Sequence, residues 1–189
     1  HTDTLTRFVG RETELALLRE RWELAKGGEG QAVLLSGEAG IGKSRIVRSV
    51  RELVGHDRHY RLRYQCSPYH VNSAFYPIIQ RLERAAGITM EEANEVKIDK
   101  LESLLKLSAV DLESIAPLFA ALLSLPAEDR YGALNLTSGQ RRDQTFAALV
   151  GQVLALSHRR PVLFVMEDVH WIDPTTQDFI GEVIAQIAG

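Results

Sequence analysis

The sequence contains a glycine-rich loop that ends in lysine and serine, residue types that bind nucleotide phosphates. The loop Gly37-Glu38-Ala39-Gly40-Ile41-Gly42-Lys43-Ser44 has a glycine, four residues and then Gly-Lys-Ser. Gly37, Gly40, Ile41 and Gly42 are expected to turn backbone N–H groups toward the phosphates, because glycine avoids Cβ clashes there. Lys43 is expected to contact the β- and γ-phosphates, and the Ser44 hydroxyl to bind Mg²⁺. The loop therefore predicts a site for a Mg²⁺-nucleotide.

The segments on either side of the loop have the patterns that such a site requires. Gln31–Ser36 contains an apolar run without alternation, which predicts a strand buried on both faces. Residues 43–53 predict a helix that ends near Gly55. A helix that begins at Lys43 directs its positive end toward bound phosphates, so this context supports the phosphate loop.

Two acids follow the clearest predicted strand of the chain. Glu167 and Asp168 come directly after the apolar run Val162–Met166, and open α/β sheets place ligands at the carboxyl ends of their strands. One carboxylate can hold the Mg²⁺ shell while its neighbour orients the attacking water. The alignment of the apolar run assigns Glu167 to the metal side and Asp168 to the water side, and the reverse assignment stays open. Ser44, Glu167 and Asp168 are thus the candidate metal-site residues, and Glu167 and Asp168 are the candidate catalytic residues.

The remaining patterns predict the elements that position these groups. Helical spacing predicts helices over 12–26, over parts of 73–125 with a break near Gly87, over 138–158, and from an Asp173-Pro174 start to 186. Alternation over 60–66 predicts a second strand, and Pro126–Leu136 is expected to be a loop. Strands alternating with helices indicate an α/β fold, a parallel sheet with flanking helices and a helical insertion at about 73–136.

Composition excludes several classes of protein. The formal net charge of −3 gives no broad basic field, so binding to nucleic acid or anionic membranes has no support from it. No apolar run is long enough to span a bilayer. The single cysteine, Cys66, cannot form an internal disulfide, which is typical of a cytoplasmic protein. A zinc set of Cys66 with His56, His59 and His70 matches no recognised finger spacing.

Four stretches together resemble the AAA+/STAND class of P-loop ATPases. They are the phosphate loop, Phe8-Val9-Gly10-Arg11-Glu12-Thr13-Glu14-Leu15, Cys66-Ser67-Pro68-Tyr69-His70 and Glu167-Asp168-Val169-His170-Trp171-Ile172-Asp173-Pro174. More narrowly, the chain is similar to the ATPase module of bacterial multidomain proteins with class III adenylate or guanylate cyclase domains, which is related to modules of LuxR-type regulators. The resemblance implies ATP, although no residue separates ATP from GTP by itself. It also implies that Phe8, Val9 and Arg11 lie against the adenine, whereas Phe8 and Val9 could instead staple the first helix.

The same resemblance implies that part of the domain lies outside residues 1–189. The class has five core strands, a sensor residue and a helical lid, whereas only strands at 31–36, 60–66 and 162–166 are predicted here. We therefore expect 1–189 to be the N-terminal part of one ATPase domain, with the sensor strand, the last strand and the lid downstream. We expect this part alone to show little or no ATP turnover and to form homo-oligomers through its strand edges.

Three functions are compatible with these motifs. The first is a regulatory ATPase, in which Mg²⁺-ATP binding and hydrolysis switch an output domain of the same polypeptide. The second is a nucleotide-binding scaffold for oligomerisation that does not hydrolyse nucleotide. A nucleic-acid motor is third, and the slightly acidic composition argues against it.

Overall fold

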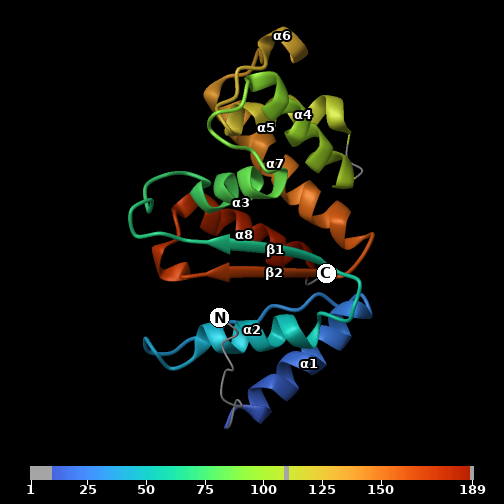
Figure 1. The fold of residues 1–189 in the computed structure, drawn as a ribbon, viewed down its shortest axis with the longest axis vertical. Coiled ribbons are helices and arrows are strands. Elements are labelled where there is room, and N and C mark those ends of the chain that lie inside the picture. Colours follow the sequence, from blue (N-terminus) through green and yellow to red (C-terminus); the bar gives the residue numbers. More distant parts are fainter. Residues whose placement is uncertain (1–9, 109–110, 188–189) are drawn as a thin grey trace. The chain divides into compact units, whose positions relative to one another are not determined.

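The computed structural model describes residues 10–108 and 111–187. The chain divides into two compact units (Figure 1). The N-terminal unit consists of His1–Arg58 and Gln186–Gly189, and the sheet unit consists of His59–Ala185. Helices flank a parallel strand pair in the sheet unit, which confirms the predicted α/β class.

In the N-terminal unit, helix α1 (Glu12–Lys26) packs against helix α2 (Lys43–Leu53). Both helices have the predicted bounds. Trp22 is buried on α1, and its indole Nε1 donates to Asp57 Oδ2 at 2.7 Å. Lys26 Nζ lies 3.4 Å from the same carboxylate. These contacts tie the end of α1 to the chain segment that follows α2.

The predicted strand over 31–36 does not form, and the prediction that it is buried on both faces was wrong. Residues 31–38 have no regular secondary structure, and Val33 and Leu34 are 47% and 79% exposed. A strand requires a hydrogen-bonded neighbour. The described residues of the N-terminal unit contain no second strand with which this segment could pair.

The sheet unit contains strands β1 (Tyr60–Gln65) and β2 (Val162–Glu167), which pair in parallel. Tyr60 lies opposite Val162, and Gln65 lies opposite Glu167. Leu62 and Tyr64 are buried while Arg61 and Arg63 are exposed, as the alternation of this strand predicts. One face of the pair is therefore apolar and covered, and the other carries charged side chains from β1.

Helices connect and follow the two strands (Figure 1). Those described in this unit are α3 (Tyr76–Ala86), α4 (Asn94–Leu105), the 3₁₀ turn η1 (Lys106–Ser108), α5 (Leu112–Leu122), α6 (Glu128–Tyr131), α7 (Ser138–Ser157), the 3₁₀ turn η2 (Val169–Trp171) and α8 (Pro174–Ile187). The predicted helices at 138–158 and 174–186 are confirmed to within one residue. Helix α6 lies inside the segment predicted as a loop, and α5 lies within the segment 73–125 that is predicted to be partly helical.

A hydrophobic core joins these helices to the covered face of the sheet. Tyr64 on β1 contacts Phe164 on β2 with ring centroids 4.6 Å apart, and Phe164 contacts Phe179 of α8 at 6.3 Å. Phe119 of α5 is fully buried in the same core. Within the described residues, no helix has the length and apolar character needed to cross a membrane.

Candidate nucleotide site

The glycine-rich loop Gly37–Ser44 is mostly exposed and leads directly into α2. Gly40 and Gly42 have φ angles of +82° and +95°, which residues with side chains rarely adopt. A Cβ at either position would meet no atom within 4 Å, so the backbone conformation and not crowding requires glycine. The Gly42 carbonyl accepts from the N–H groups of Arg45 and Ile46, both at 3.0 Å. The positive end of a formed helix therefore lies next to the loop, as anion binding requires.

The ammonium group of Lys43 contacts the backbone of this loop. Lys43 Nζ donates to the carbonyl oxygens of Gly37 at 2.6 Å and of Glu38 at 2.8 Å. Ser44, the next residue, is exposed in the first turn of α2. The ammonium, the exposed hydroxyl and the helix end together have the chemistry that binds a phosphate group with its metal ion.

The segment before α1 also reaches the phosphate loop. Arg11 Nη2 donates to the Ile41 carbonyl at 3.3 Å, and Arg11 Nη1 donates to Glu14 Oε1 at 2.6 Å. The hydrogen bond from Arg11 holds the pKa of Glu14 below its ordinary value. Arg11 thus lies beside the loop, whereas the predicted adenine-site residues Phe8 and Val9 lie outside the described residues.

In the sheet unit, Glu167 is the last residue of β2 and lies on the face opposite the hydrophobic core. The register places Arg63 opposite Val165 and Gln65 opposite Glu167, so all of these side chains share one face. Arg63 donates to Glu167 Oε2 from Nη2 at 2.5 Å and from Nε at 3.2 Å. This hydrogen bond raises the pKa of Arg63. Glu167 is therefore an ion-paired carboxylate.

Asp168 begins the turn after β2 in an unusual backbone conformation. Its φ of +56° is left-handed, which costs free energy in a residue with a Cβ and is often found at functional sites. Gln65 Nε2 donates to Asp168 Oδ2 at 2.6 Å, and the Asp168 carbonyl accepts from the Trp171 N–H at 2.9 Å. Both acids are thus oriented by side chains of β1.

Sequence reasoning did not identify Arg63 and Gln65 as partners of the acids. The available signal was the polar alternation in Tyr60–Gln65, which shows that these side chains share a face. The parallel register between β1 and β2 could not be read from one sequence. That register determines that Arg63 contacts Glu167 and that Gln65 contacts Asp168.

The residue types present fit Mg²⁺ bound together with a nucleotide. The part of the chain that the structure describes contains no group of three or more His, Cys, Asp or Glu side chains that could hold a metal by themselves. Mg²⁺ typically takes one or two carboxylates together with substrate phosphates. Ser44 in the N-terminal unit carries a hydroxyl oxygen, and Glu167 and Asp168 in the sheet unit each carry a carboxylate, which are oxygen groups of the kinds that Mg²⁺ prefers.

A glycine-rich loop that opens a helix, in an α/β chain with acids at the carboxyl end of a parallel strand, defines the class of P-loop nucleotide-binding proteins. The chain belongs to the AAA ATPase domain family, whose model matches residues 7–187. Membership of this family implies ATP binding, usually with Mg²⁺.

The chain is also similar to an uncharacterized protein of Rhizobium meliloti. The two are 30% identical over 181 residues, which covers 96% of this chain and 17% of the relative. The chain thus spans about a sixth of the length of the curated relative that it matches. No solved structure gives a significant match.

Proposed function

We propose that this chain binds Mg²⁺-ATP through Gly37–Ser44, and that in the full-length protein nucleotide hydrolysis switches an output domain. The observation that carries the proposal is the phosphate loop, where two glycines with positive φ precede a helix that begins with Lys43. Lys43 would exchange its loop carbonyl partners for phosphate oxygens. Bound Mg²⁺ would neutralise phosphate charge, with the Ser44 hydroxyl as one ligand.

The binding step is tested by the variant Lys43→Ala. Loss of a charge-assisted hydrogen bond to phosphate should weaken Mg²⁺-ATP binding by about tenfold to a hundredfold in isothermal titration calorimetry. Arg48→Ala is a matched control, because Arg48 is a cation on the same helix whose exposed side chain pairs with Glu52 at 3.2 Å. This control should bind within about twofold of wild type. Equal affinity of Lys43→Ala and wild type would contradict the proposed site, and titration with GTP tests the preference for ATP.

We propose further that Glu167 and Asp168 act in hydrolysis, with Glu167 on the metal side and Asp168 on the water side. In the full-length protein, Glu167→Gln and Asp168→Asn should each lower phosphate release by about a hundredfold or more while nucleotide still binds. Asp178→Asn is the control, because Asp178 is an exposed acid of α8 in the same unit. Wild-type turnover in both acid variants would argue against the hydrolytic role.

The proposal of an output domain is supported by the resemblance to ATPase modules that are linked to cyclases and transcription regulators. A switch requires that ATP and ADP favour different arrangements of the protein. Limited proteolysis of the full-length protein with ATP, with ADP and without nucleotide tests this requirement. The same cleavage pattern in all three states would contradict the switch.

A scaffold that binds nucleotide without hydrolysis is the second candidate. The observation that favours it is that both acids already have partners, Glu167 with Arg63 and Asp168 with Gln65. A carboxylate held in an ion pair is less available to a metal shell. Nucleotide-dependent oligomerisation without phosphate release from the full-length protein would establish the scaffold in place of the switch.

A further inference from the structure

Asp173 is a buried carboxylate with hydrogen bonds to two different segments of the chain. Only 2% of the residue is exposed. Its Oδ1 accepts from the Thr176 N–H at 2.9 Å and from the Phe75 N–H at 3.3 Å, and its Oδ2 accepts from the Thr176 hydroxyl at 2.5 Å. The bonds to Thr176 cap α8, as the sequence predicts for a residue before Pro174. The bond to Phe75 serves a different element, because Phe75 precedes α3.

This bond joins the two loops that follow the parallel strands, here called the post-strand loops. The first covers residues 66–75 between β1 and α3, and the second covers 168–173 between β2 and α8. At their strand ends the Cys66 N–H donates to the Glu167 carbonyl at 3.0 Å. At their far ends the loops meet through Asp173 and Phe75. Each loop is therefore fixed to the other at both ends.

Each post-strand loop also contains one residue in a strained backbone conformation, which the surrounding contacts must maintain. Phe75 and Asp168 both have left-handed φ angles, +61° and +56°. A non-glycine residue keeps this conformation only where surrounding contacts impose it. Phe75 is buried in the core and its N–H is bound by Asp173, so its conformation is imposed from both sides.

We propose that Asp173 is a positioning residue that holds the second post-strand loop, and with it Asp168 and Glu167, in the geometry required for hydrolysis. This inference rests on the proposed function of the two acids. Asp173 acts through the backbone, because the hydrogen-bonded turn η2 lies between it and Asp168, whose carbonyl accepts from the Trp171 N–H. Misplacement of a reacting group by about 1 Å can cost a hundredfold in rate.

The reactivity of the Cys66 thiol reports on the packing of the two post-strand loops and does not depend on ATPase activity. Cys66 is the only cysteine of the 189 residues and is 3% exposed at the start of the first post-strand loop. Burial, followed by the charges of Asp173 and Asp168, raises the pKa of its thiol to about 11. Loosening of the loops should therefore expose the thiol and accelerate its reaction with a disulfide reagent.

Three substitutions of Asp173 distinguish its hydrogen bond to Phe75 from its capping of α8. Asp173→Ser keeps an oxygen that can cap α8, but the serine side chain is one bond shorter, so its hydroxyl does not reach the Phe75 N–H as Asp173 Oδ1 does. Asp173→Asn keeps the carbonyl Oδ1 that accepts from both N–H groups. Asp173→Ala removes all acceptors. Thr137→Ala is the matched control, because it removes the N-cap of α7 in the same unit, where Thr137 Oγ1 accepts from the Gln140 N–H at 3.2 Å.

The measurements are phosphate release and ATP affinity in the full-length protein, and labelling of Cys66 by dithionitrobenzoate in the 189-residue chain. We expect Asp173→Ser to lower kcat by about tenfold to a hundredfold with ATP affinity within about threefold, and to accelerate Cys66 labelling by about tenfold or more. Asp173→Asn should restore both quantities to within about threefold of wild type, and Thr137→Ala should leave both unchanged.

Wild-type labelling of Cys66 in Asp173→Ser would overturn the proposal, even if Asp173→Ala does not fold. Wild-type kcat in Asp173→Ser would also overturn it, because Asp173 would then only cap the helix. Failure of the proposed function is recognised separately. In that case wild type and Lys43→Ala release equally little phosphate, while Cys66 labelling still decides whether Asp173 holds the loops.

Discussion

Lys43 and Glu167 are the charged residues of the proposed nucleotide site, and each contacts a different kind of partner. Lys43 donates to two neutral carbonyl oxygens of its own loop, whereas Glu167 is paired with the charged guanidinium of Arg63. Phosphate oxygens are stronger acceptors for an ammonium than carbonyls are, so binding can replace the contacts of Lys43 at low cost. Release of Glu167 requires the loss of an ion pair. Under the proposed function, Lys43 can therefore exchange its partners for phosphate directly, whereas use of Glu167 requires Arg63 to move.

Cys66 allows a pH-dependent prediction at the scale of one residue. Burial raises its pKa from 9.0 to about 11, so at pH 8 only on the order of one thiol in a thousand is ionised. Reaction with iodoacetamide should be slow at pH 8 in the folded chain and should rise until about pH 11. In urea the same thiol should titrate near its ordinary pKa. Because the folded pKa lies above the unfolded one, protonated Cys66 adds stability below pH 9 that is lost toward pH 11.

The control for this stability effect is Cys66→Ala. Burial also raises the pKa of Tyr64 to about 12, which lowers stability at high pH in the same direction. The difference between wild type and Cys66→Ala in urea midpoint, measured at pH 8 and at pH 10.5, isolates the thiol. A pH-rate profile of folded Cys66 centred near 9 would contradict the prediction.

At the scale of elements, helix ends could be predicted from the sequence where glycine pairs or an Asp-Pro pair mark them. Helix α1 ends at Gly27-Gly28, and α8 begins at Pro174, directly after Asp173. The limits of α5 were less predictable, because Pro117 lies inside the helix without ending it. The strand predicted at 31–36 failed for another reason. Its apolar residues indicate strand propensity, but a strand forms only where a partner backbone is available.

The candidate site was predictable to the same extent. Chain-local signals, the glycine spacing and the acids after an apolar run, indicated Lys43 and Glu167 as candidate site residues. Contacts made across the fold were not predictable, because Arg63 is 104 residues from Glu167 and Phe75 is 98 residues from Asp173 in the sequence. Such pairs depend on strand register and on the path of the loops. A single sequence specifies neither of these.

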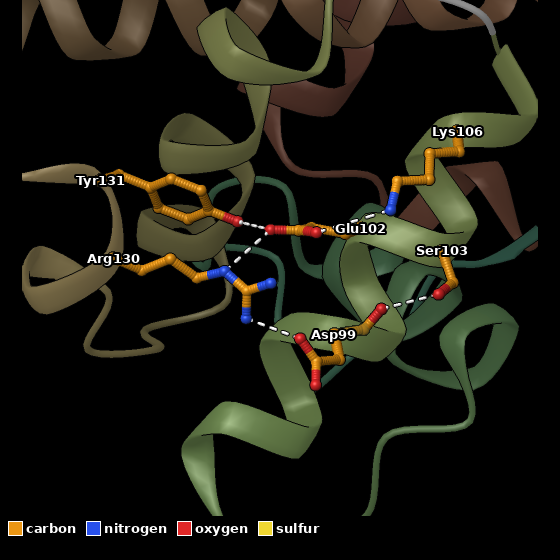
Figure 2. Close-up of polar contacts among 6 residues, drawn as sticks. All are labelled: Asp99, Glu102, Ser103, Lys106, Arg130 and Tyr131. Atoms are coloured by element: carbon orange, nitrogen blue, oxygen red, sulfur yellow. Dashed lines mark hydrogen bonds and ion pairs between the residues drawn. The ribbon is translucent and has the colours of Figure 1, made fainter.

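Helices α4 and α6 are joined by a polar cluster around one carboxylate, shown in Figure 2. Glu102 Oε1 accepts from the Tyr131 hydroxyl at 2.6 Å and from Arg130 Nε at 3.0 Å, and its side chain is only 12% exposed. Arg130 also binds Asp99 at 2.6 Å. Burial and the hydrogen bond to Glu102 raise the pKa of Tyr131 above its ordinary value. This cluster fixes the short helix α6, which has few residues of its own to stabilise it.

We predict that Glu102→Gln lowers the free energy of unfolding by about 1–3 kcal/mol, because it removes the charge that both partners bind. Urea denaturation followed by circular dichroism measures the loss. Lys106→Ala is the control, since its ammonium lies 3.7 Å from Glu102 and its side chain is 61% exposed. That control should cost less than about 0.5 kcal/mol. Equal losses in the two variants would show that the cluster does not stabilise the fold.

At the scale of the whole molecule, the hydrophobic core belongs to one of the two units. The large cluster of buried apolar side chains is drawn from Leu62 to Val183, all within the sheet unit. Among the described residues of the N-terminal unit, the buried apolar side chains are Trp22, Ile46 and Val54. A segment of this size with so few buried side chains is marginal on its own. The two units should therefore differ strongly in independent stability.

We predict that residues 59–187 expressed alone unfold cooperatively, and that residues 1–58 expressed alone do not fold. The sheet unit keeps its strand pair and its core. The N-terminal segment buries too little apolar surface on folding to offset the conformational entropy that it loses. Thermal unfolding by circular dichroism and calorimetry tests both segments. Phe119→Ala in 59–187 removes a fully buried ring and should cost about 3–5 kcal/mol, while Met90→Ala, at a side chain 94% exposed, should be neutral. A broad, non-cooperative transition in 59–187 would show that this core needs the N-terminal unit to fold.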